Sequence, residues 1–84
     1  MNEKIMVVDD DKDIREVIQV LLSSEGYEVI EASNGREALE LVDDDTDLII
    51  LDVMMPEMNG YQACVLLREK TKAPILFLTA KGAG

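Results

Sequence analysis

Acidic residues follow two short apolar runs in this chain of 84 residues. Asp9–Asp11 come directly after the run at 5–8, and Asp52 closes the run at 48–51. Carboxylates crowded within a few ångströms cannot all stay ionised without a counter-charge. Mg²⁺ is suited to that place, because it binds carboxylate, carbonyl and water oxygens. The spacing therefore indicates metal-dependent chemistry in one acidic pocket.

Composition narrows the classes of function. A net charge of −10 argues against nucleic acid as a direct partner, since phosphate backbones are bound by Lys and Arg. Histidine is absent, which excludes imidazole catalysis and histidine metal ligands. The single Cys64 cannot form an internal disulfide, and a buried structural thiol in a reducing compartment is expected. Without a membrane-length apolar stretch or a signal peptide, we expect a cytoplasmic chain with no membrane contact.

The first half of the chain predicts a strand, a helix and a second strand. Residues 4–8 are predicted to form a strand that is buried on both faces, because its apolar run at 5–8 is continuous. Asp10 or Asp11 is placed to cap the following helix, and Gly26 to end it. Residues 28–32 alternate partly, as an edge strand does. The helix is indicated by one apolar stripe at helical spacing, formed by Ile14, Val17, Ile18, Leu21 and Leu22.

The second half repeats the alternation. A turn at 33–35 leads into a helix through Val42, which the acidic run 43–47 ends. Strands are predicted at 48–53 and 75–79, with a turn-rich loop at 54–60 and a helix at about 61–70 between them. Alternating strands and helices predict an α/β fold with a doubly wound parallel sheet. We expect one domain over 1–84, with four strands, three helices and strand order 2-1-3-4.

That strand order would bring the aspartates at the strand ends together at one edge of the sheet. Ligands of such sheets bind beyond the carboxyl ends of the strands, beside the point where the strand order reverses. Asp9, Asp10 and Asp52 would share that crevice, with Thr79 at the same edge. Asp11 is most simply a helix cap, and one helix needs only one. Asp52 lies too far before the next helix to cap it, so a functional role is favoured.

At these residues the chain resembles a known family, the receiver domain of bacterial two-component response regulators. The resemblance covers the whole chain. It is carried by Val7–Asp10, by the segment Leu51–Gly60 (LDVMMPEMNG) and by Leu78–Lys81 (LTAK). Each piece alone is a modest signal, whereas the combination at these spacings is specific.

The resemblance implies a role for each matching residue. Asp52 would be the phosphoacceptor, taking a phosphoryl group from the phosphohistidine of a sensor histidine kinase. Asp9, Asp10 and Asp52 would hold Mg²⁺ together with the backbone carbonyl of Met54. Thr79 would be the switch hydroxyl that turns toward the phosphoryl group. The chain would then be a signalling module of a phosphorelay rather than an enzyme.

The chain also departs from the family pattern. The sequence ends after the fourth strand, without the fifth strand that carries the family's phosphate-pairing lysine, and Lys81 does not take that role. We therefore expect a truncated receiver domain in which phosphorylation is impaired. About half of one sheet face and the edge at Ile75–Leu78 would be uncovered, which predicts homo-oligomers formed through either surface.

Two other readings stay open. The chain could be a structural fragment whose main property is self-association. It could also be a Mg²⁺-dependent phosphohydrolase of the haloacid-dehalogenase kind, because Asp9 and Asp11 form an Asp-x-Asp pattern after the first strand. Against the second reading, Lys12 and Asp13 replace the small residue and threonine usual in that class, and the chain is short for its catalytic domain.

Overall fold

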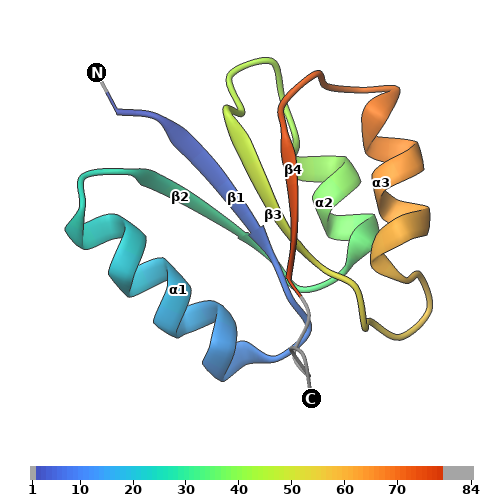
Figure 1. The fold of residues 1–84 in the computed structure, drawn as a ribbon, viewed down its shortest axis with the longest axis horizontal. Coiled ribbons are helices and arrows are strands. Elements are labelled where there is room, and N and C mark those ends of the chain that lie inside the picture. The colour runs from blue at the N-terminus through green and yellow to red at the C-terminus, as the bar shows by residue number, and fades with distance from the viewer. Residues whose placement is uncertain (1, 79–84) are drawn as a thin grey trace.

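The computed structural model describes residues 2–78, in which strands and helices alternate along the chain (Figure 1). The strands are all parallel and lie in the order β2-β1-β3-β4, so the predicted strand order is confirmed. The strands are β1 (Lys4–Val8), β2 (Glu28–Ala32), β3 (Leu48–Asp52) and β4 (Ile75–Leu78), and the helices are α1 (Lys12–Ser24), α2 (Gly35–Leu41) and α3 (Gly60–Arg68).

The helices lie on opposite faces of the sheet. Helix α1 packs against β1 and β2, whereas α2 and α3 pack against each other on the other face (Figure 1). Side chains of a strand alternate between the faces, so Met6 and Val8 join the core under α2 and α3 while Ile5 and Val7 point toward the face of α1. All four are buried. The continuous apolar run at 5–8 is thus buried on both faces, as expected for a strand in the middle of the sheet.

Helix α1 begins where the sequence predicted. The Asp11 side chain accepts hydrogen bonds from the N–H groups of Asp13 and Ile14, which identifies it as the N-cap. At the other end Gly26 takes a φ of +93°, a left-handed conformation that suits glycine. The apolar stripe is less buried than its spacing suggested, because none of the residues of α1 is fully buried.

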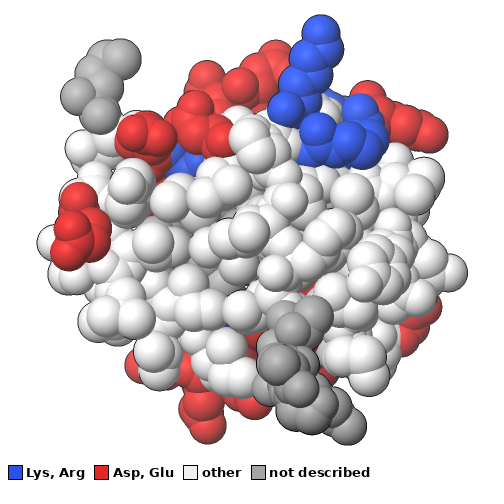
Figure 2. Space-filling model, viewed as in Figure 1, with Lys and Arg blue, Asp and Glu red and all other residues white. Residues whose placement is uncertain are grey.

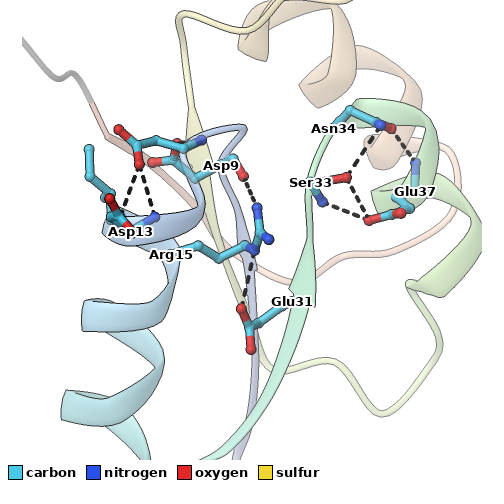
Figure 3. Close-up of polar contacts among 9 residues, drawn as sticks. Asp9, Asp13, Arg15, Glu31, Ser33, Asn34 and Glu37 are labelled. Carbon is cyan, nitrogen blue, oxygen red and sulfur yellow. Dashed lines mark hydrogen bonds and ion pairs between the residues drawn. The ribbon is translucent and has the colours of Figure 1, made fainter.

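Helix α2 is short, and hydrogen bonds among Ser33, Asn34 and Glu37 hold its start. The Asn34 side chain accepts from the N–H of Glu37, and the Glu37 carboxylate accepts from the N–H and hydroxyl of Ser33 (Figure 3). These bonds from Ser33 lower the pKa of Glu37. The helix ends at Leu41, so the expectation that it includes Val42 was wrong: Val42 is the C-cap and has extended backbone geometry.

The boundaries of two further elements, β3 and α3, differ from the predictions. Strand β3 ends at Asp52 and does not include Val53. Helix α3 starts at Gly60, because Asn59 and Gln62 form a capping box there, and it ends at Arg68 rather than near Lys70. The chain turns back toward β4 directly after α3, and the Arg68 guanidinium donates to the carbonyl of Ala73 across this turn. Within residues 2–78, no helix has the length and apolar character that spanning a membrane requires.

Candidate functional site

Three carboxylates meet at the carboxyl end of the sheet. One oxygen from each of Asp9, Asp10 and Asp52 lies within 4.8 Å of the others. The sheet register explains this, because Val8 of β1 pairs with Leu51 of β3 and each is followed by an aspartate. Asp9 and Asp52 are 2% and 5% exposed, whereas Asp10 is exposed. The structure therefore brings these predicted site residues together at the point where the strand order reverses.

Asp9 is held by three hydrogen bonds, of which the one from Arg15 can be followed in Figure 3. Its N–H donates to the carbonyl of Ala32 at 3.1 Å, and its Oδ1 accepts from the N–H of Asp11 at 2.8 Å. Its carbonyl accepts from Nη1 of Arg15 at 2.7 Å. Nε of Arg15 donates in turn to Glu31 on β2, at 3.1 Å. Main chain and side chain of this acid are thus both fixed.

The surroundings of Asp52 shift the pKa of its carboxyl group. Burial raises its pKa from 3.8 to about 6, and the negative charges of Asp9 and Asp10 act in the same direction. One bond opposes the shift, since the N–H of Met54 donates to Oδ1 of Asp52 at 3.1 Å. A bound cation would lower the cost of ionising Asp52 beside these other acids.

The donor set suits Mg²⁺. Three carboxylate oxygens that can face one point, one of them from an exposed residue, match the hard oxygen ligands and partial hydration that Mg²⁺ prefers. Met54, predicted to contribute its carbonyl, lies two residues beyond Asp52 and is 64% exposed. Its N–H is already bonded to Asp52, which leaves the carbonyl as its available main-chain group.

The loop after β3 passes very close to the phosphoacceptor candidate. The N–H of Gly60 donates to the carbonyl of Val53 at 3.0 Å. A Cβ at Gly60 would collide with the carbonyl oxygen of Asp52 and lie 2.8 Å from Cα of Val53. Glu57 in the same loop has a φ of 69°, which is unusual for a residue other than glycine. The backbone around Asp52 is therefore tightly constrained.

Two members of this site, Gly60 and Arg15, could not be recognised from the sequence pattern. The sequence predicts only a turn at Gly60, because hydrophobic periodicity carries no information on the close approach of two backbone segments. Arg15 is one of eight basic residues in the sequence. Its contacts with Asp9 and Glu31 become evident only once α1 is seen packed beside β1 and β2. Thr79 lies outside the described residues, and the strand before it is described as far as Leu78, which pairs with Asp52.

Comparisons with known proteins agree on one family. The family model for the response regulator receiver domain matches residues 5–83. The transcriptional regulatory protein YrkP of Bacillus subtilis is 46% identical over 83 residues, 99% of this chain and 36% of that protein. The transcriptional regulatory protein CpxR of Escherichia coli is 45% identical over 80 residues, 95% of this chain and 34% of that protein.

A solved structure shows the same fold. The response regulator TrrA from Thermotoga maritima, in complex with Mg²⁺ and BeF, matches with a TM-score of 0.85 and 44% identity, over 95% of this chain and 70% of that one. This chain spans about a third of the length of the curated relatives described above.

Proposed function

The chain belongs to the response regulator receiver domain family, and on that premise we propose that it accepts a phosphoryl group on Asp52 from the phosphohistidine of a sensor histidine kinase. The observation that carries the proposal is the position of Asp52, whose carboxylate lies within 4.8 Å of oxygens of Asp9 and Asp10. Most of the catalysis of phosphoryl transfer is positioning and charge neutralisation. Two further acids beside the nucleophile suit this reaction, because they could hold a cation that neutralises negative charge.

The transfer is a single displacement at phosphorus. A carboxylate oxygen of Asp52 forms a bond to phosphorus, while the bond from phosphorus to the imidazole nitrogen breaks. The electron pair of that bond returns to the imidazole, which takes up a proton. Only the ionised carboxylate can attack, so the raised pKa of Asp52 matters for the rate. The hydrogen bond from Met54 to Oδ1 favours the ionised form and leaves Oδ2 as the attacking atom.

Asp9, Asp10 and Asp52 would hold Mg²⁺, with the carbonyl of Met54 as a further ligand. Bound there, the ion would neutralise charge on the acids and on the transferring group. Thr79 would donate its hydroxyl to the phosphoryl group once it is bound. Among the described residues no lysine forms an ion pair with Asp52, since the two ion pairs join Lys4 to Asp43 and Arg15 to Glu31. We therefore expect transfer to be slow.

A small phosphodonor tests the proposal without the kinase. Incubation with acetyl phosphate and Mg²⁺ should add the mass of one phosphoryl group to the chain, and D52N should abolish the addition. D44N is the matched control, because Asp44 is an exposed aspartate outside the acidic cluster and should leave the addition unchanged. Phosphate found on the D52N protein would contradict the assignment.

The phosphohydrolase reading predicts a different result. A haloacid-dehalogenase-like enzyme would turn over a phosphomonoester, and D9N would abolish turnover while D52N would not. The receiver assignment predicts no multiple turnover for either variant. Release of inorganic phosphate from p-nitrophenyl phosphate therefore separates the two functions.

We also propose that the chain self-associates through an uncovered apolar face. Val17, Val20 and Leu21 on α1 are 58%, 56% and 61% exposed. Leu76 on β4 is 57% exposed, and it points to the same side as α1, because its neighbour Phe77 packs on Tyr61 of α3. Figure 2 shows uncharged atoms across most of this face, with charged side chains mainly at its margins. Apolar patches of this kind mark interfaces.

A second copy of the chain is the proposed occupant of this face. A two-fold arrangement would place the apolar centre of each copy on the other and leave the acidic margins in solvent. In sedimentation velocity the wild-type chain should form dimers at micromolar concentration, and L21K should be monomeric. V65K is the control, because Val65 is 65% exposed on α3, on the opposite side of the sheet. A monomeric wild-type chain would refute the proposal, and an edge-to-edge assembly through β4 would survive L21K.

A further inference from the structure

We propose that Arg15 is a positioning residue for the acidic site: it holds the Asp9 backbone so that the three carboxylates keep the geometry that Mg²⁺ requires. The inference rests on the proposed function and extends it to a residue outside the metal ligands. It is carried by two hydrogen bonds of one guanidinium group, to the carbonyl of Asp9 and to the carboxylate of Glu31 (Figure 3).

The Asp9 carbonyl needs a partner that the sheet does not provide. The ladder between β1 and β2 ends at the pair Val8 and Ala32, so the carbonyl of Asp9 lies beyond the last strand pair. Asp9 is only 2% exposed, and a buried carbonyl without a partner is costly. Nη1 of Arg15 satisfies it at 2.7 Å. This contact fixes the peptide that joins Asp9 to Asp10, and therefore the relative positions of both acids.

Arg15 is itself held firmly. Its side chain is 15% exposed, and Nε donates to Glu31 Oε1 at 3.1 Å. The bond joins α1 to the edge strand β2, directly before Ala32, whose carbonyl receives the N–H of Asp9. A guanidinium group can bridge two acceptors in fixed directions, whereas a lysine ammonium is a single point donor on a flexible stem. The geometry therefore specifies arginine at this position.

Positioning and simple charge predict opposite effects on metal affinity. If Arg15 acted only through its charge, R15A would make the acidic pocket more negative and tighten Mg²⁺ binding, and R15K would change nothing. If Arg15 positions Asp9, both variants weaken Mg²⁺ binding, because removal of groups that orient metal ligands typically costs about ten- to a hundredfold in affinity. The sign of the R15A effect thus separates the two.

Selectivity between cations separates positioning from a merely structural role. Mg²⁺ demands near-ideal octahedral geometry, whereas Ca²⁺ accepts flexible geometry and variable ligand number. A loosened Asp9 should therefore lower Mg²⁺ affinity more than Ca²⁺ affinity. A general loss of stability would reduce the fraction of folded protein and lower both affinities by the same factor.

The experiment is titration calorimetry of the chain with Mg²⁺ alone and Ca²⁺ alone. We expect R15K to bind Mg²⁺ about tenfold more weakly and to show a reduced ratio of Mg²⁺ to Ca²⁺ affinity. R36K is the matched control, because Arg36 is exposed on α2 and its substitution should leave both affinities unchanged. E31Q tests the same contact without removing Arg15, and it should reduce the ratio in the same direction should R15K fail to fold.

Wild-type Mg²⁺ affinity in R15K or E31Q, or equal losses for both cations, would overturn the inference while leaving the proposed function intact. Absence of Mg²⁺ binding in the wild-type chain would instead overturn the metal site, and the role of Arg15 with it.

Discussion

The main-chain N–H of Asp11 donates to Oδ1 of Asp9 at 2.8 Å, so the third aspartate of the run orients the first. The Asp11 side chain meanwhile caps α1 through the N–H groups of Asp13 and Ile14. The three consecutive acids thus have different roles: Asp9 and Asp10 lie close to Asp52, and Asp11 caps the helix. Because the bond to Asp9 comes from the backbone of Asp11, the side chain of Asp11 can be changed independently of it.

Substitution of Asp11 should therefore affect stability more than metal binding. D11A removes the helix cap and should lower the free energy of unfolding by about 1 kcal/mol, measured by urea denaturation. Its N–H still reaches Asp9, so calorimetry should show Mg²⁺ affinity close to wild type. D11N keeps a side-chain acceptor and should retain most of the stability. If D11A lost Mg²⁺ binding as completely as D10N, Asp11 would have to be a ligand.

The raised pKa of Asp52 predicts a pH-dependent stability. The folded chain binds the Asp52 proton more tightly than the unfolded chain, so this residue favours folding at low pH, and that contribution is lost as the pH rises from about 4 to about 6. The shift from 3.8 to about 6 corresponds to at most about 3 kcal/mol. D52N cannot titrate and should be more stable than wild type at pH 7, with the difference shrinking toward pH 4 in metal-free urea denaturation. Equal pH profiles for the two proteins would contradict this explanation.

Addition of Mg²⁺ should stabilise the folded chain. A ligand that binds only the folded state at a hundred times its Kd contributes about 2.7 kcal/mol, which thermal unfolding at fixed protein concentration would detect as a higher Tm. Chelation with EDTA should reverse the shift. D10N loses one carboxylate of the cluster and should show a much smaller shift, whereas the control D44N should behave as wild type. A shift of full size in D10N would place the ion elsewhere.

Substitution of Gly60 and of Gly35 by alanine should lower the free energy of unfolding by different amounts. At Gly60 an added Cβ meets the backbone at Asp52 and Val53, which cannot move without displacing the site, so G60A should destabilise the chain by about 2 kcal/mol or more. At Gly35 the closest atom is Sδ of Met58, 2.6 Å away at the end of a flexible side chain. G35A should therefore cost less. Urea denaturation of both variants gives the comparison, and equal losses would show that the backbone near Asp52 is free to relax.

The strand order, the carboxylate cluster and the helix cap could all be predicted from the sequence. The apolar runs define the strands, and parallel strands joined by helices put their carboxyl ends at one edge, so Asp9, Asp10 and Asp52 had to approach one another once β1 and β3 were neighbours. The Asp11 cap followed from local preference alone. These features depend on periodicity and on connections that are short along the chain.

Contacts that depend on how individual side chains and backbone segments pack were decided only by the tertiary structure. The burial that raises the pKa of Asp52, the Arg15 bridge from α1 to Asp9 and Glu31, and the approach of Gly60 to the Asp52 backbone depend on packing at distances of a few ångströms. Residue type and periodicity carry no information at that scale. The exact ends of α3 were likewise decided in the folded structure, by the capping box at Asn59 and the turn after Arg68.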